Sequence, residues 1–374
     1  MKIAVVGLRG IPNIMGGIES HCQQIYPRIA KEDVQITVIG RSPYLESRRS
    51  EYEGISVIGL WAIQNKFLET FLHTVVAIIY AAIFIRPNVL HIHAVGPALF
   101  TPLARLLGLK VVVTHHGADY DRQKWNAIAK FILKSGEKMA CLFANKVIVV
   151  GRSLTSTLKM KYPKQKDRIT FIPNGTLAAF GQGCTERDLP KDLAITSGNY
   201  ILAVARLVPE KGLHDLVDAY NKSETTHKLV IVGDADHNDD YSRKIKSKAS
   251  EKVIIAGRRG GSELQSLYKF ARVFVLPSYH EGHPIVALEA ISAGTQVLLS
   301  DIQPNLDIAL QVDCYFRVGD VNSLTNKLDE LDNLNLEIDQ SAFLARYDWD
   351  AIAVNTLRQY MKATGRLQAA GGTQ

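Results

Sequence analysis

The sequence has few cysteines and lacks the spacings typical of metal or redox sites. Its four cysteines are scattered with no C-x-x-C pair, and none of its 11 histidines falls in an H-x-x-x-H pattern. Disulfide scaffolds and structural zinc sites both require more closely spaced ligands. We therefore expect reduced, packed thiols in a cytoplasmic protein that has no bound metal and no cofactor.

The sequence also lacks a long hydrophobic run. Its most apolar tract, Phe71 to Ile85, is 15 residues long and includes His73 and Thr74, whereas a membrane-spanning helix needs about 20 apolar residues. We expect a buried helix here. The apolar run at the start of the chain, residues 1–7, is too short for a signal peptide.

No nucleic-acid motif is present, although the net charge is +7 and the pI is 9.1. Nucleic acid, an anionic membrane or an anionic substrate would each explain this balance. The basic segment 121–138 lacks the exposed aromatic residues that favour nucleic acid. We expect its apolar stripe to pack in a core, and contact with an anionic membrane remains open. Its cations are Arg122, Lys124, Lys130, Lys134 and Lys138, and its apolar residues include Trp125, Ile128, Phe131 and Ile132.

Apolar strand candidates alternate with segments of helix length along the chain. At 374 residues, with 47% hydrophobic and 22% charged residues, the chain is long enough for two globular domains. The alternation predicts parallel sheets covered by helices on both faces, with ligands beyond the carboxyl ends of the strands. The candidates in the first half are 3–6, 35–39, 55–60, 89–93, 110–114 and 146–150, and those in the second half are 200–204, 228–233, 253–256, 273–277, 296–301 and 315–318.

The segment 278–295 lies between two of the buried strands and enters a helix near Pro284, a residue suited to the first helical turn. The free N–H groups of such a helix start, here near Ile285 and Val286, suit a phosphate or a sugar hydroxyl. Glu281 stands in the turn and Glu289 in the apolar helix, where a carboxylate needs a partner. Two solvated acids are the alternative.

Cations and histidines follow other strands. Arg206 and Lys211 are five residues apart after strand 200–204, where they could bind a diphosphate or simply be exposed loop cations. His116, before Gly117 and after strand 110–114, is a site candidate, with a packed structural histidine as the alternative. His91 and His93 point to one face of their strand.

The loop after the first strand is glycine-rich but is not a dinucleotide fingerprint. Arg9 replaces the second glycine of G-x-G-x-x-G, and Pro12 favours an extended loop. We expect the helix to start after Gly16 and Gly17. These two glycines permit either a close backbone approach to a ligand or a tight turn.

Together these motifs resemble the retaining glycosyltransferases of family 4. The resemblance rests on Glu-x7-Glu from Glu281 to Glu289, on the Thr-x-His-Gly-x-Asp loop 114–119, and on the Gly-Gly loop, and it covers about residues 2–361. The loop from Arg9 to Gly17 is most similar to bacterial polysaccharide rhamnosyltransferases.

The resemblance implies the GT-B fold, in which two Rossmann-like, doubly wound parallel α/β domains face a cleft. The acceptor-side domain would span 1–180 and include the C-terminal helix 347–363. The nucleotide-sugar domain would span 199–346, after a linker. A disordered tail, 365–374, would follow.

The implied reaction moves a sugar from a UDP- or dTDP-sugar, dTDP-rhamnose among them, to a glycan or lipid-linked glycan in cell-surface polysaccharide synthesis, with retention of anomeric configuration. Arg206 and Lys211 would bind the diphosphate, Glu281 the donor sugar, Glu289 the ribose and His116 the sugar or acceptor. Cations at the diphosphate would replace a metal.

Further residues carry over from the same motifs. Gly16 and Gly17 would face the diphosphate and acceptor, and Arg258 the nucleotide base. His283 and Pro284 replace an aromatic residue and a glycine of many relatives, which leaves the sugar unassigned. A non-catalytic nucleotide-sugar binding or regulatory protein, and an epimerase or phosphorylase of the same fold, remain alternatives.

Overall fold

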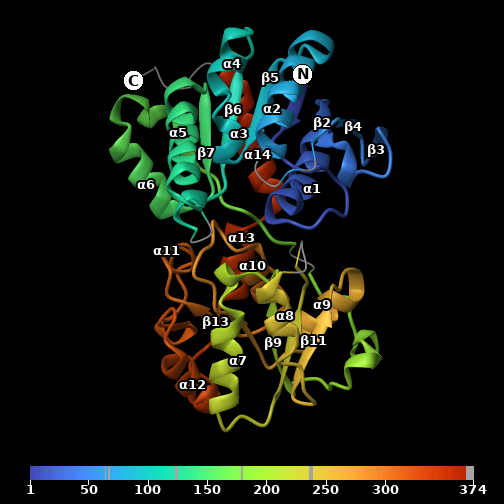
Figure 1. Ribbon diagram of the computed structural model, residues 1–374, viewed down its shortest axis with the longest axis vertical. Coiled ribbons are helices and arrows are strands. Elements are labelled where there is room, and N and C mark those ends of the chain that lie inside the picture. Colours follow the sequence, from blue (N-terminus) through green and yellow to red (C-terminus); the bar gives the residue numbers. More distant parts are fainter. Residues whose placement is uncertain (64, 66–67, 123–124, 178–179, 236–238, 368–374) are drawn as a thin grey trace. The chain divides into compact units, whose positions relative to one another are not determined.

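The computed structural model describes residues 1–63, 65, 68–122, 125–177, 180–235 and 239–367. The chain forms two compact units: unit 1 is Met1–Asn174 together with the segment from Trp349, and unit 2 is Gly175–Asp348. Each unit contains one sheet with helices on both faces (Figure 1). Among the described residues, no helix is both long and apolar enough to cross a membrane.

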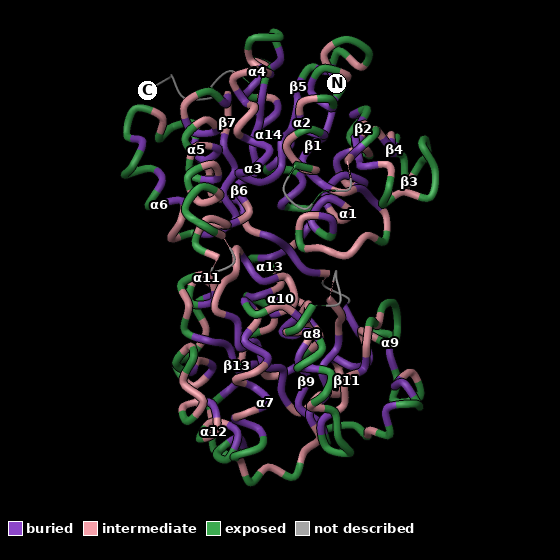
Figure 2. The backbone as a smooth tube through the Cα atoms, viewed as in Figure 1, coloured by how far each residue is buried: buried purple, intermediate pink, exposed green. Residues whose placement is uncertain are grey.

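The sheet of unit 1 has eight strands in the order β3-β4-β2-β1-β5-β6-β7-β8, all parallel except β3, which pairs antiparallel with β4. The order reverses between β1 and β5, so successive connections run away from this point in opposite directions. Buried strands run through the centre of each unit (Figure 2). The strands are β1 (Lys2–Val6), β2 (Gln35–Arg41), β3 (Arg49–Tyr52), β4 (Ile55–Leu60), β5 (Val89–His93), β6 (Val111–His115), β7 (Lys146–Val149) and β8 (Ile169–Phe171).

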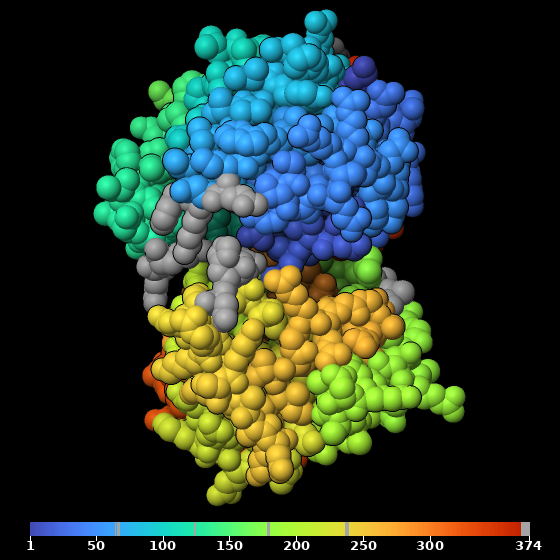
Figure 3. Space-filling model, turned by 45° about the vertical axis from the view of Figure 1, so that its right-hand side comes forward, coloured from blue at the N-terminus to red at the C-terminus, as the bar shows by residue number. Residues whose placement is uncertain are grey.

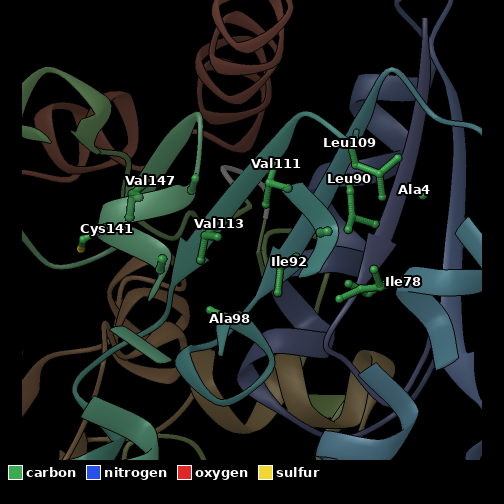
Figure 4. Close-up of a cluster of buried hydrophobic side chains, with 14 of the residues drawn as sticks. Ala4, Ile78, Leu90, Ile92, Ala98, Leu109, Val111, Val113, Cys141 and Val147 are labelled. Atoms are coloured by element: carbon green, nitrogen blue, oxygen red, sulfur yellow. The ribbon is translucent and has the colours of Figure 1, made fainter. Parts of the chain in front are cut away.

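Helices α2 to α6 cover one face of this sheet, and α1 and α14 cover the other. On the first face, Ile78 of α2, Ala98 of α3 and Cys141 of α5 join the same apolar core as Leu90 and Val113 of the strands (Figure 4). The helices are α1 (Gly17–Ala30), α2 (Glu69–Tyr80), continued by the π-helix η2 (Ala81–Ile85), α3 (Val95–Ala98), α4 (Thr101–Leu106), α5 (Ala127–Phe143), α6 (Arg152–Lys161) and α14 (Trp349–Thr364).

The sheet of unit 2 has six parallel strands in the order β11-β10-β9-β12-β13-β14. Its order reverses between β9 and β12. The strands are β9 (Tyr200–Val204), β10 (Lys228–Val232), β11 (Val253–Gly257), β12 (Val273–Leu276), β13 (Val297–Ser300) and β14 (Tyr315–Phe316). The helices are α7 (Leu213–Lys222), α8 (Asp240–Lys246), α9 (Gly261–Lys269), α10 (Ile285–Ser292), α11 (Gln303–Leu306), α12 (Val321–Asp329) and α13 (Gln340–Arg346).

The predicted class, two doubly wound parallel α/β domains, is confirmed. The edge strands β3 and β8 were not predicted, because short strands carry little periodic signal. The unit boundary lies at Asn174 rather than at residue 180: residues beyond it bond within unit 2, as where Ser292 Oγ donates to the Leu177 carbonyl at 2.5 Å. Of the predicted tail, 365–367 bond back to the end of α14 and 368–374 lie outside the described residues.

Two helix predictions in unit 1 are wrong in part. The tract Phe71 to Ile85 is not a buried helix, because its outer side chains are exposed. The segment 121–138 becomes helical only at Ala127, after the Asn126 cap, and Ile128 and Phe131 are 71% and 72% exposed rather than packed in a core. Lys124 lies outside the described residues.

Close packing of α3 on α5 depends on Gly136. A Cβ at this position would lie 1.9 Å from the carbonyl oxygen of Val95. We expect Gly136→Ala to lower the free energy of unfolding by about 1–3 kcal/mol, the usual cost of overpacking. Urea denaturation measures this change. Gly96→Ala is the matched control, because its Cβ would meet Leu133 at an ordinary 3.6 Å, and equal stability of the two variants would contradict the packing argument.

Candidate functional site

In unit 1 the candidate residues gather where the strand order reverses. The loop after β1 is held by Arg9, whose backbone N–H donates to Glu19 Oε1 at 3.0 Å and whose Nη1 donates to the Met15 carbonyl at 3.3 Å. Helix α1 begins at Gly17, one residue before the predicted start, with Gly16 as its N-cap. Apart from the adjoining backbone of α1, no atom of the described residues lies within 4 Å of the place where a Gly17 side chain would start, so the backbone there is open to close approach by a ligand.

His116 takes part in a cluster of imidazoles that the sequence reasoning found only in part. Its Nε2 lies 2.8 Å from His93 Nδ1, and the two rings are stacked. The ring of His21, from α1, meets the His116 ring edge-on at 5.0 Å, and His21 Nδ1 lies 2.9 Å from Asn174 Oδ1. His21 was missed because nothing local marks it: it is one polar position in a helix.

The cluster continues through buried hydroxyls to the C-terminal helix. Tyr26 Oη lies 2.5 Å from His93 Nε2 and 2.8 Å from His91 Nδ1, and His91 also contacts Tyr360 of α14 at 2.7 Å and Thr114 at 2.7 Å. The prediction that His91 and His93 share a face is confirmed, since Tyr26 reaches both. His91 is thus a packed histidine with hydroxyl groups on both of its ring nitrogens.

Burial keeps these imidazoles neutral. It lowers the pKa of His21 to about 4 and holds the pKa values of His91, His93 and His116 well below their ordinary value, because the protonated form would lose its hydration and meet its neighbours' charge. At neutral pH each ring therefore offers one N–H donor and one lone pair. This set suits hydroxyl groups better than anions.

The same geometry raises the question of a metal. Within the described part of the chain, His21, His93 and His116 offer nitrogen atoms that all lie within 4.8 Å of one another. Neutral imidazoles are good ligands for zinc and related ions. The hydrogen bonds among the rings already satisfy these nitrogens in part, and the expectation of no metal stays a prediction.

His115, the neighbour of His116, is held in the packing instead. Its Nε2 lies 3.3 Å from Glu137 Oε2 on α5, and the same carboxylate accepts bonds from Tyr120 at 2.7 Å and Lys161 at 2.6 Å. Burial raises the Glu137 pKa, but these three partners outweigh it and lower the value to about 2. This anchor fixes the end of β6, and hence the position of His116, against α5.

In unit 2 an ion pair joins the two strands that flank the reversal point. Lys211, after β9, donates to Glu281 Oε1, after β12, at 2.6 Å, and Ser278 Oγ donates to the same oxygen at 2.7 Å. The Glu281 side chain is only 9% exposed. Burial raises its pKa, but Lys211 and Ser278 outweigh burial and lower it. The Glu281 carboxyl group is therefore ionised at neutral pH.

A glycine allows this approach. Gly212 has φ +62°, and a Cβ there would lie 2.1 Å from the Pro277 carbonyl oxygen, so a side chain would push the turn of Lys211 away from the loop of Glu281. Arg206 is half-buried in the same turn after β9. The structure thus brings together Lys211 and Glu281, two predicted site residues that are 70 positions apart in the sequence.

Glu289 lies on α10 in an apolar environment. Its Oε2 accepts a hydrogen bond from Tyr268 Oη at 3.1 Å, and burial raises its pKa to about 7 although this bond lowers it. Helix α10 starts at Ile285, so the N–H groups of Ile285 and Val286 point out of its first turn without helical acceptors. Pro284 is the N-cap residue, one position before the first turn where it was expected.

Two other candidates, His283 and Arg258, have contacts of their own. His283 is buried against the Tyr347 ring at 5.5 Å, and burial lowers its pKa to about 4. Arg258, after β11, donates to the Ala235 carbonyl at 3.4 Å. The adjacent Asp234 pairs with Lys246 at 2.8 Å, and residues 236–238 lie outside the described residues.

Comparison with known proteins agrees with this fold. The family model described as Glycosyltransferase Family 4 matches residues 15–176, and the model described as Glycosyl transferases group 1 matches residues 185–339. Sucrose-phosphate synthase from Thermosynechococcus elongatus shares the fold, with a TM-score of 0.83 at 20% identity over 98% of this chain and 100% of that chain.

Curated relatives point the same way. Glycogen synthase of Mycobacterium tuberculosis is 26% identical over 97% of this chain and 95% of its own length. The UDP-Gal:alpha-D-GlcNAc-diphosphoundecaprenol alpha-1,3-galactosyltransferase of Escherichia coli is 27% identical over 58% of this chain and 59% of its own length. Fold and matches together define a glycosyltransferase of the GT-B class. Within that class the chain is of the family 4 type.

The raised pKa of Glu289 predicts a pH-dependent stability. Between its ordinary pKa of 4.5 and about 7, the folded chain binds more protons than the unfolded chain. Stability from this group is therefore complete below pH 4.5 and is lost as the pH rises through 7. We expect Glu289→Gln to lack this loss and to gain on the order of 3 kcal/mol relative to the parent between pH 5 and 8. Urea unfolding across this range measures it; parallel curves for the two proteins would contradict the assignment.

Proposed function

We propose that the protein transfers a sugar from a nucleotide-sugar donor to a glycan or lipid-linked glycan acceptor with retention of anomeric configuration. The observation that carries the proposal is the pair of Lys211 and Glu281 at the reversal point of the unit 2 sheet, with Arg206 in the same turn. A cation and an acceptor placed side by side fit a ligand that has both a diphosphate and sugar hydroxyls.

The departing diphosphate is the group that most needs stabilisation in this reaction. As the glycosidic bond to the donor breaks, negative charge builds on the diphosphate, and fixed cations lower the energy of that state. Arg206 and Lys211 supply the cations, and the N–H groups of Ile285 and Val286 add oriented dipoles. Glu281, ionised by Lys211, accepts from the donor sugar. We assign no general base.

In this proposal Glu289 accepts hydrogen bonds from the ribose hydroxyls. A carboxylate held by one hydrogen bond from Tyr268 retains lone pairs for two vicinal hydroxyl donors. Arg258 would lie beside the nucleotide base, since it follows β11 on the same edge of the sheet. His283 would act indirectly: it packs against Tyr347 and so holds the loop of Glu281 in place.

Unit 1 supplies the acceptor side. His116 presents a neutral imidazole, which donates to or accepts from a hydroxyl, and the open backbone at Gly17 admits a sugar ring. We propose a lipid-linked acceptor met at the cytoplasmic face of an anionic membrane, in keeping with the net charge of +7. The Escherichia coli relative named for a diphosphoundecaprenol acceptor supports this choice. A UDP- or dTDP-sugar is the proposed donor, with dTDP-rhamnose favoured by the Arg9–Gly17 loop.

The donor class is tested by thermal shift against UDP-, dTDP-, GDP- and ADP-sugars. A ligand bound only by the folded state raises the melting temperature. We expect stabilisation by UDP- or dTDP-sugars, followed by release of the nucleoside diphosphate once an acceptor is added. Stabilisation without turnover on any acceptor would instead identify a non-catalytic binder, and product without acceptor an epimerase or phosphorylase.

Arg206→Ala and Lys211→Ala should each reduce transfer by roughly tenfold to a hundredfold, the equivalent of one charge-assisted hydrogen bond of about 1.5–3 kcal/mol. Initial rates of nucleotide release measure the effect. Lys244→Ala, an exposed cation on α8, is the control and should leave the rate unchanged. Near-parental turnover in both site variants would remove the diphosphate assignment.

We expect transfer to continue in EDTA, because arginine and lysine side chains supply the charge that a metal supplies elsewhere. Rates before and after chelation test this expectation. Loss of activity restored by Mn²⁺ or Mg²⁺ would overturn it. Activity that Zn²⁺ restores in the parent but not in the His21→Ala variant would place a metal among the imidazoles of unit 1.

A further inference from the structure

The outer face of α2 and η2 is apolar and open to solvent. After Glu69 no charged residue occurs until Arg86. Five side chains form what we call the apolar stripe, and their exposed fractions run from 39% to 53%; Phe84, beside its end, is 70% exposed. In Figure 3 the light-blue atoms of this part of the chain lie at the surface of unit 1. The members of the stripe are Leu68, Leu72, Val76, Ile79 and Ile83.

The spacing of the stripe places its members on the side of the helix that faces away from the core of unit 1. Its members follow one another at intervals of four, four, three and four residues, so they share one side of the helix. The opposite side, with Ala77, Ile78 and Ala81, already packs on the sheet. This helix is therefore apolar on both sides. A continuous apolar face on a folded protein marks an interaction surface.

Positive charge is concentrated in the segment that follows the stripe along the chain. From Arg86 to Arg168 the sequence has fifteen Lys and Arg against four Asp and Glu, so this segment carries +11 while the whole chain carries +7. The segment supplies α3 to α6, which cover the same face of the sheet as α2. The rings of Phe71 and Phe100, 6.3 Å apart, connect α2 to the start of α4.

Other exposed apolar side chains lie within this cationic layer. Ile128 and Phe131 extend from the first turns of α5, and Leu106 ends α4 at 85% exposure. Lys134 and Lys138 follow on α5 and are also exposed. Apolar residues mixed with cations on one face are the composition of a surface that lies on an anionic bilayer, where the apolar groups enter the headgroup region and the cations meet lipid phosphates.

We propose that the apolar stripe of α2 and η2 docks unit 1 onto an anionic lipid bilayer. A second copy of the chain fits less well, because a symmetric dimer through this face would bring two segments of +11 together. The inference deepens the proposed function, since it gives the surface through which a lipid-linked acceptor would be approached. It assigns the contact mainly to α2 rather than to α5, where the sequence indicated it.

Co-sedimentation with phosphatidylcholine vesicles, with and without phosphatidylglycerol, tests the proposal. We expect binding to the anionic vesicles that weakens as salt rises. Leu72→Ser/Ile79→Ser should weaken it by about tenfold, since two partly exposed aliphatic side chains lose their burial in lipid. Leu306→Ser/Val312→Ser, a pair of exposed apolar residues in unit 2, is the matched control and should bind like the parent.

Two further measurements keep the outcomes distinct. Lys134→Ser/Lys138→Ser should weaken binding to the anionic vesicles only. All variants should keep the parental thermal shift with the donor nucleotide, so that loss of vesicle binding and failure of the proposed donor are separate results. No binding to anionic vesicles, equal binding by Leu72→Ser/Ile79→Ser and the parent, or a dimer of the parent that this variant abolishes would each overturn the proposal.

Discussion

The parallel pairing of strands is the constraint on which the rest of the structure depends. Parallel strands must be joined by crossover connections, so all their carboxyl ends lie at one edge of each sheet. Where the strand order reverses, between β1 and β5 and between β9 and β12, two such connections diverge and leave their turns side by side. The histidine cluster and the Lys211–Glu281 pair lie at these two points. The order of the strands sets both positions, and in unit 2 Gly212 also permits the close approach of the two turns.

The two units compensate for the burial of polar groups in different ways: one keeps them neutral, and the other pairs a charge. In unit 1, His21, His93 and His116 are neutral, and hydrogen bonds among rings and hydroxyls replace water. In unit 2, the charge of Glu281 is kept by a lysine and a serine. A neutral donor and acceptor set suits sugar hydroxyls, whereas a charged set suits a diphosphate, so the electrostatics of each unit agree with its place in the proposed transfer.

Errors of the sequence reading have a common physical origin. Periodicity shows that the tract Phe71–Ile85 is apolar, but it does not show how many of its faces another element covers. In the folded chain α2 has the sheet on one side only, and so a helix expected to be buried has an exposed outer face. Likewise the helix at Ala127 starts where Asn126 caps it, although the cations of this segment begin at Arg122.

The sequence by itself determined the fold class and most of its strands, because both follow from periodicity. It also singled out the candidate site residues Arg206, Lys211, Glu281, Glu289 and His116, because they stand in motifs a few residues long. Only the tertiary structure decided which side chains meet: Lys211 with Glu281, Glu289 with Tyr268, His116 with His93 and, through Tyr26, Tyr360 of the last helix. Such pairings depend on strand order and helix packing, which also bring His91 against Tyr360, 269 positions away. No local sequence pattern predicts these pairings.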